Sequence, residues 1–211
     1  MIKVKTTTND VTDALGELGL TVEQLHEAIK AGFVERSRCT ANDAPFFPAL
    51  LQWNHTQRGL REQLIPAGWS ASDDGNYCTV VSPDNTIAIA TASGCDNTGN
   101  PIFSPTTKSP KGPNTVDAVT SNAAQLLLPG VIQMPTVPKA TDGKVTWLLL
   151  FYPAEQEIRA ELSLPAAMGG NGKPDTWSVR IILPPLPLDP IMSIAAPDFG
   201  PDLDVEVVRR A

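Results

Sequence analysis

The second half of the chain contains VTWLLLFY at residues 145–152, IRAELSL at 158–164 and WSVRIIL at 177–183. Each stretch has the length and the β-branched and aromatic content of a strand, and turn-forming residues separate it from the next. The first is apolar on both faces, which places it in the middle of a sheet, whereas the second alternates apolar and polar residues, which predicts one face against water. We therefore expect an antiparallel β-meander that carries the main core and buries Trp147 and Trp177.

Two polar residues of this meander have opposite charges. Glu161 lies in the second strand and Arg180 in the third. We expect them to form a cross-strand pair on the solvent face, where such a pair contributes only a few tenths of a kcal/mol.

The N-terminal region is typical of short helices. In residues 21–32 the apolar positions follow a helical period, Thr21 and Gln24 fit a capping box, and Gly32 fits the position after the last turn. A single-turn helix is expected before it, starting at residue 9 or 10 and ending at residue 18.

A longer helix and a hairpin follow. Pro48 suits the first turn of a helix that runs to Leu64. Residues 77–81 and 86–91 are typical of two strands joined by the turn Ser82-Pro83-Asp84-Asn85. We expect the helix to pack against this hairpin through a buried stripe of Leu50, Trp53, Gln57, Leu60 and Leu64. A third helix is expected at residues 116–128.

These elements predict an α+β fold in which N-terminal helices and a β-hairpin pack with a C-terminal antiparallel β-meander. Residues 1–47 form the N-terminal helical segment in this interpretation, and residues 48–183 form the α+β body. Residues 184–211 contain many prolines and form an arm that lies over the body or reaches a second copy of the chain. Residues 205–208 would form an edge strand within the arm.

Composition argues against several classes of protein. The formal net charge is −7, which discourages binding to a phosphate backbone, so we do not expect nucleic acid as a partner. No apolar run approaches the 18 residues of a membrane span, and the N-terminal residues lack a signal-peptide core. Three cysteines without CxxC spacing are typical of reduced thiols, so we expect a cytoplasmic protein.

No complete catalytic, metal or nucleotide-binding motif is present. The histidines, His26 and His55, lie on expected helices, and no spacing pairs either with Cys39, Cys78 or Cys95. The glycines at 94–99 match neither nucleotide-binding fingerprint. We expect no metal or other cofactor, and an enzyme is the less favoured class, although a Cys–His pair formed by the fold stays open.

Residues 93–115 form a long connection without hydrophobic periodicity, a kind of loop that is either functional or disordered. Between residues 101 and 116 its only formal charges are Lys108 and Lys111, accompanied by hydroxyl residues that include Thr106 and Thr107. Ammonium groups, hydroxyls and free amides suit a phosphate or an acidic partner surface. We therefore expect a binding site that also includes Asp96 of the same loop and Arg58 and Arg61 of the preceding helix. A solvated connecting loop would have the same composition.

Several short segments resemble uncharacterised proteins of bacterial phages, plasmids and other mobile elements. They are Leu60-Arg61-Glu62-Gln63-Leu64, Gly68-Trp69, Thr98-Gly99, Lys111-Gly112, Glu161-Leu162-Ser163-Leu164-Pro165 and Arg180-Ile181-Ile182-Leu183-Pro184. The resemblance covers roughly residues 48–185 and implies a bacterial, mobile-element origin. It implies no activity.

The leading hypothesis is a non-catalytic binding or accessory protein that recognises a partner, expected to be another protein, or an anion through the loop 93–115. A homodimer formed through the C-terminal arm is an additional hypothesis. An enzyme acting on a phosphorylated or nucleic-acid substrate would instead need a concave pocket where a carboxylate, His or Cys meets the loop lysines, whereas binding alone predicts a flat or convex loop. An acidic protein-interaction inhibitor of the anti-defence type would need carboxylates clustered on one face.

Overall fold

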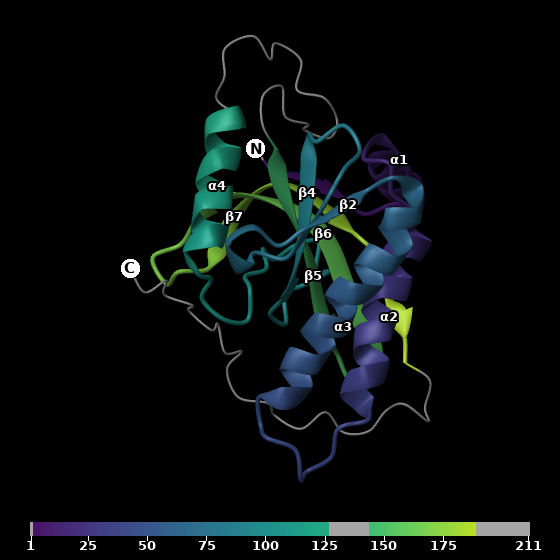
Figure 1. Cartoon of the computed structure of the whole chain (residues 1–211). Helices are drawn as coiled ribbons and strands as arrows, with labels where there is room; N and C mark the ends of the chain where they lie inside the picture. The colour runs from purple at the N-terminus through teal and green to yellow at the C-terminus, as the bar shows by residue number, and fades with distance from the viewer. Residues whose placement is uncertain (1, 127–143, 189–211) are drawn as a thin grey trace.

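The computed structural model describes residues 2–126 and 144–188, and a mixed β-sheet forms its middle layer (Figure 1). The strand order is β1-β7-β6-β5-β4-β3-β2, and β8 pairs with β6 outside this path. The strands are β1 Lys3–Lys5, β2 Ser70–Ser72, β3 Thr79–Val81, β4 Ile87–Ser93, β5 Val145–Pro153, β6 Glu157–Met168, β7 Pro174–Ile182 and β8 Leu186–Pro187. Two pairs, β4 with β5 and β1 with β7, are parallel, and the other pairs are antiparallel.

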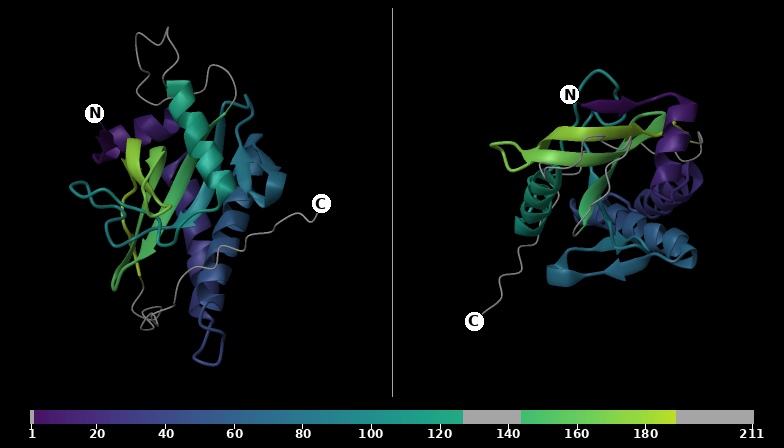
Figure 2. Two further views of the ribbon diagram at one scale, coloured as in Figure 1. Left: turned by 90° about the vertical axis from the view of Figure 1, so that its left-hand side faces the viewer. Right: turned by 90° about the horizontal axis from the view of Figure 1, so that it is seen from above.

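Helices cover both faces of the sheet, as the view from above in Figure 2 shows. The first face carries α1 Thr8–Glu17, α2 Val22–Ser37 and α3 Phe47–Leu64, and the other carries α4 Pro113–Leu126. Single 3-10 turns occur at Ile65–Ala67 and Asp74–Asn76. The expected α+β fold and its β5-β6-β7 meander are therefore confirmed. No helix within residues 2–126 and 144–188 combines the length and the apolar character that a membrane crossing requires.

The main core lies between the sheet and the first three helices. It contains Leu25 and Ile29 of α2 together with Trp147, Leu149 and Phe151 of β5, all fully buried. A second cluster on the opposite face contains Leu148, Leu150 and Trp177. Strand β5 is central and both tryptophans are buried, as predicted from the apolar stretch at 145–152.

The capping box of α2 is confirmed, but its predicted end is wrong. Thr21 and Gln24 exchange the two expected hydrogen bonds, whereas the helix continues past Gly32 to Ser37. A Cβ atom on Gly32 would collide with the side chain of Thr56 and the carbonyl of Gln52 on α3. Gly32 is therefore present because the two helix backbones approach closely at this point.

Helix α1 begins at Thr8, one or two residues earlier than predicted, and its ten residues make it longer than the expected single turn. Its N-cap is Thr7, whose hydroxyl accepts a hydrogen bond from the backbone of Asp10. The helix ends where expected, because Gly19 has a φ of 72°, a left-handed conformation that favours glycine.

Helix α3 packs on the first hairpin, as predicted. The indole N–H of Trp53 donates to the carbonyl of Thr91 on β4 at 3.2 Å, and the Thr91 hydroxyl donates to Gln57 at 3.0 Å. The turn at 82–85 forms with Asn85 at a φ of 57°. Leu50 departs from the predicted stripe, since 44% of its surface is exposed.

The second face of β6 is buried, which corrects the expectation that it meets water. Glu161 and Ser163 on that face are fully buried, because α4 and the loop before it cover them. Within this strand Pro165 cannot donate a ladder hydrogen bond. The side-chain amide of Asn122 on α4 bridges β5 and β6 at this point. Its oxygen accepts from the backbone N–H of Thr146, and its nitrogen donates to the carbonyls of Thr146 and Pro165.

The sequence did not predict the strands β1 and β2. Part of the expected structure lies outside the described residues. The strands β1 and β2 are three residues long, with one apolar residue each, which is too short for an alternation of period two to be recognised. The last two residues of the predicted helix at 116–128, the edge strand at 205–208 and the dimer contact through the arm fall outside the described ranges. Of the arm, Leu186–Pro187 pairs with β6.

Candidate functional site

Residues 94–112, here called the anchored loop, cross the face of the sheet beside α4 and project outward from the body (Figure 2). Backbone hydrogen bonds close the base of the loop: Cys95 N–H donates to Thr106, and Lys108 N–H donates to Ser93. Gly94 and Thr107 form an isolated antiparallel bridge. The loop is therefore an ordered hairpin-like excursion.

A buried ion pair between two strands of the sheet anchors the loop. The guanidinium of Arg180 donates to the carboxylate of Glu161 through Nε at 3.0 Å and Nη2 at 2.5 Å, and the two residues are 1% and 0% exposed. This corrects the predicted surface pair: Arg180 lies opposite Ser163 in the ladder, and the two charges meet diagonally in the interior. A buried pair is stable only when further hydrogen bonds satisfy both groups.

The anchored loop supplies those further hydrogen bonds. Arg180 also donates to the carbonyls of Asn100 and Phe103, and the Gly99 N–H donates to Glu161 at 3.0 Å. The hydroxyl of Ser163 donates to the same carboxylate at 2.7 Å. The loop and the ion pair therefore stabilise each other.

The tip of the loop presents two large apolar residues to solvent. Ile102 is 82% exposed and Phe103 is 58% exposed, the highest values among the exposed large hydrophobic side chains of the described residues. The side-chain oxygen of Asn100 accepts hydrogen bonds from both of their backbone N–H groups. The apolar tip is therefore held in one backbone conformation.

The hydroxyl and charged residues predicted for the loop do not form one cluster. Thr107 is fully buried and donates to the carbonyl of Ser109, and Thr106 is half-buried with its N–H directed to the Sγ of Cys95. Lys108 and Asp96 are exposed. Lys111 is half-buried and lines a cavity that Lys108 does not reach.

Arg58 and Arg61 lie on α3, and each forms an ion pair with a carboxylate. Arg58 pairs with Glu62 at 2.8 Å, and Arg61 pairs with Asp73 at 2.5 Å. Both arginines line a different cavity from Lys111. Their contribution to the field of the loop lysines stays a prediction.

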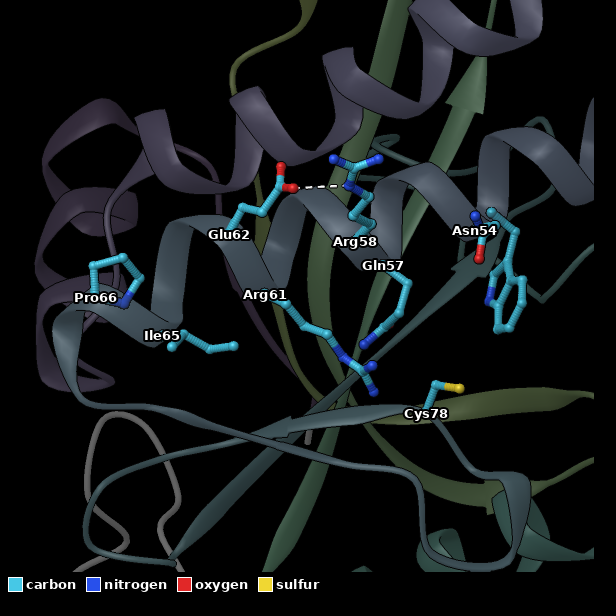
Figure 3. A pocket seen from close by; sticks show the side chains of 9 residues that line it. Asn54, Gln57, Arg58, Arg61, Glu62, Ile65, Pro66 and Cys78 are labelled. Carbon is cyan, nitrogen blue, oxygen red and sulfur yellow. Dashed lines mark hydrogen bonds and ion pairs between the residues drawn. The ribbon is translucent and has the colours of Figure 1, made fainter.

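Two neighbouring cavities follow α3 and share Trp53 and Cys78 in their walls. The first, about 430 Å³, lies between the second half of α3 and Cys78 (Figure 3). The second, about 280 Å³, is bounded by the first half of α3, by β4 and by residues 109–111 of the anchored loop. The loop lysine Lys111 and Cys78 therefore line the same concave site, which is one of the features that an enzyme would need.

Two ionisable side chains of the second cavity, Tyr77 and Cys78, are poorly suited to acid–base or nucleophilic chemistry at neutral pH. Burial raises the pKa of Tyr77 to about 12, against a smaller opposing influence from Thr115. Burial and the neighbouring Asp73 raise the pKa of the Cys78 thiol, which keeps it protonated. The described residues contain no group of three or more His, Cys, Asp or Glu side chains arranged to hold a metal ion.

Sequence reasoning missed the two features that organise the site. Ile102 and Phe103 lie in a segment without periodicity, and only their size in an otherwise polar loop could have drawn attention to them. The role of Glu161 and Arg180 depends on what covers β6, which the strand pattern does not encode. No family model matches the chain, and no curated protein or solved structure is significantly similar to it.

Proposed function

We propose that this chain is a non-catalytic binding protein that recognises another protein through the loop 93–115, with Ile102 and Phe103 as the central contacts. The observation that carries the proposal is the combination of an exposed apolar tip with a buried ion pair that fixes its backbone. Exposed apolar side chains on an ordered loop are characteristic of interaction sites. Because the loop is already ordered, binding would lose little conformational entropy.

The loop lysines have a secondary role in this proposal. Lys108 is exposed at the base of the loop, where a rim charge alters the association rate and the salt dependence more than the affinity. The enzymatic alternative has less support, because the pKa of Cys78 is raised away from the range of a reactive thiolate. The cytoplasmic setting and the mobile-element origin stay predictions.

The experiment compares three tagged proteins in a lysate of the organism that encodes the chain: wild type, the tip variant Ile102→Ser with Phe103→Ser, and the lysine variant Lys108→Ala with Lys111→Ala. Proteins captured by the wild type are identified by mass spectrometry, purified and titrated by calorimetry. We expect the tip variant to lose about 2–4 kcal/mol of binding free energy and the lysine variant about 1 kcal/mol, with a weaker salt dependence.

The controls are the thermal midpoints of the variants, which should stay near that of the wild type because the changed side chains are exposed or half-buried. Partners that bind the tip variant as tightly as the wild type would contradict the proposal. If a partner binds the tip variant but not the lysine variant, recognition through the charges of the loop lysines would be favoured instead.

A further inference from the structure

The cavity between α3 and Cys78 contains polar groups that the fold itself does not satisfy. Gln57 is 4% exposed, and its Nε2 has no hydrogen-bond partner among the described residues. The Nε of Arg61 is also buried without a partner. Figure 3 shows both side chains extending from α3 into the space between the helix and Cys78.

Both unsatisfied groups are N–H donors. The Oε1 of Gln57 accepts from the Thr91 hydroxyl, so in this orientation the amide nitrogen faces the cavity, and the Nη2 of Arg61 donates to Asp73 and to the Ser72 carbonyl. A buried donor without an acceptor is unfavourable, and native structures rarely retain one. A group that binds in this cavity and satisfies both donors must therefore be a hydrogen-bond acceptor.

The remaining walls define the rest of the ligand. Trp53, Ile65 and Pro66 are apolar, and the charged residues of the lining are Arg58, Arg61 and Glu62. Arg58 pairs with Glu62, and Arg61 pairs with Asp73 just outside the lining, so the described side chains of the site leave no surplus of positive charge for a doubly charged phosphate. A single carboxylate would instead compete with Asp73 for Arg61. A cavity of about 430 Å³ accommodates a small organic group.

We propose that this cavity binds a monocarboxylate that carries an apolar group, with the carboxylate accepting from Gln57 Nε2 and Arg61 Nε and the apolar group against Trp53 and Ile65. Two sources share this chemistry: a free organic acid and the C-terminal carboxylate of a peptide that ends in an apolar residue. The site does not use the anchored loop, so it stands or falls independently of the proposed function.

The test uses the full-length ¹⁵N-labelled protein and follows the side-chain signals of Gln57 and Arg61 during titration. The probes are 3-phenylpropionate, its neutral amide, and acetyl-Gly-Gly-Phe with either a free or an amidated C-terminus. We expect the free carboxylates to shift both signals with saturation, and the amidated forms to bind at least tenfold more weakly. Binding of 3-phenylpropionate identifies a small-acid site, whereas binding of the peptide acid alone identifies a site for peptide C-termini.

Matched variants locate the interaction. Gln57→Glu keeps the shape and the acceptor for Thr91 but replaces the donor with a carboxylate, so affinity should fall at least tenfold. Gln63→Glu makes the same chemical change on the exposed face of α3 and should alter affinity less than threefold. Asp73→Asn removes a competing anion from Arg61 and should strengthen binding twofold or more. If Gln57→Glu does not fold, Arg61→Lys keeps the charge and removes the Nε donor, with the same expected loss.

Two results would overturn the proposal. One is the absence of saturable shifts at Gln57 and Arg61 with every carboxylate probe. The other is equal binding by Gln57→Glu and Gln63→Glu. An increase in stability of Gln57→Glu without carboxylate binding by the wild type would show that the amide oxygen, turned toward Arg61, already satisfies the guanidinium.

Discussion

Replacement of Arg180 by methionine tests whether the ion pair supports the loop. Methionine occupies a similar volume without charge, so the change removes the hydrogen bonds and leaves the packing nearly intact. The carboxylate of Glu161 then loses two of its four donors, the Nε and Nη2 of Arg180, and keeps Gly99 and Ser163. An uncompensated charge remains in a position with no exposed surface.

The expected destabilisation follows from this geometry. Breaking a buried pair by removing one partner costs about 3–5 kcal/mol, because the other charge stays buried. The double variant Glu161→Leu with Arg180→Met removes both charges and should lie within about 2 kcal/mol of the wild type. Even so, the carbonyls of Asn100 and Phe103 lack their donor in both variants, so the loop should open more often than in the wild type.

Urea unfolding measures the first effect, and amide hydrogen exchange across residues 99–107 measures the second. The wild type should protect the Gly99 amide, and both variants should reduce that protection. Glu161→Leu removes the acceptor of this amide directly, whereas Arg180→Met keeps the acceptor and acts through more frequent opening of the loop. A destabilisation of less than about 1 kcal/mol for Arg180→Met would refute the buried-pair argument. Unchanged exchange at Gly99 would refute the role of the pair in ordering the loop, whatever the global stability.

Three further predictions concern packing and burial. Gly32→Ala should destabilise by about 2 kcal/mol or more in urea unfolding, because its Cβ meets the backbone of α3, and an unchanged midpoint would contradict that close approach. Asn122→Ala should cost about 2–4 kcal/mol by the same assay, since it leaves buried groups of Thr146 and Pro165 unpaired, and a loss below 1 kcal/mol would show that water replaces the amide. Tyr77→Phe should be neutral or stabilising by up to about 2 kcal/mol at pH 7, because the hydroxyl is buried without a partner. The raised pKa of Tyr77 contributes to the free energy of unfolding of the wild type, and this contribution is complete below pH 10 and is lost as the pH rises from about 10 toward about 12. Measurements of unfolding against pH should show no such loss in Tyr77→Phe.

The elements that the sequence predicted well are those whose signal is local. The capping box at Thr21, the turn that ends in Asn85 and the apolar stretch at 145–152 depend on neighbouring residues, and all three form as expected. Gly32 misled the prediction because a glycine fits both a helix end and a close helix contact. Only the position of α3 separates these two roles.

The candidate site was harder to predict because tertiary structure determines it. The lysines stood out as charges in a neutral loop, yet Lys108 and Lys111 lie in different surroundings. Gln57 looked like an ordinary member of a buried stripe, and its unsatisfied nitrogen becomes evident only beside Arg61 and Cys78. The alternation in β6 correctly separated its two faces but could not show that a loop would cover the polar one.

The pairing of β1 with β7 has a consequence for folding during synthesis. Lys3 lies beside Val179 and Lys5 beside Ile181 in the parallel ladder, so the edge of the sheet joins two segments that are synthesised far apart in time. At roughly 5 to 20 residues per second, a ribosome reaches Val179 roughly nine to thirty-five seconds after it makes Lys3. Helices α1 to α3 can associate during that interval, but β1 has no strand to join. The pairing of β1 can therefore form only after β7 has been made, and nascent chains that stop before β7 keep β1 without its partner strand.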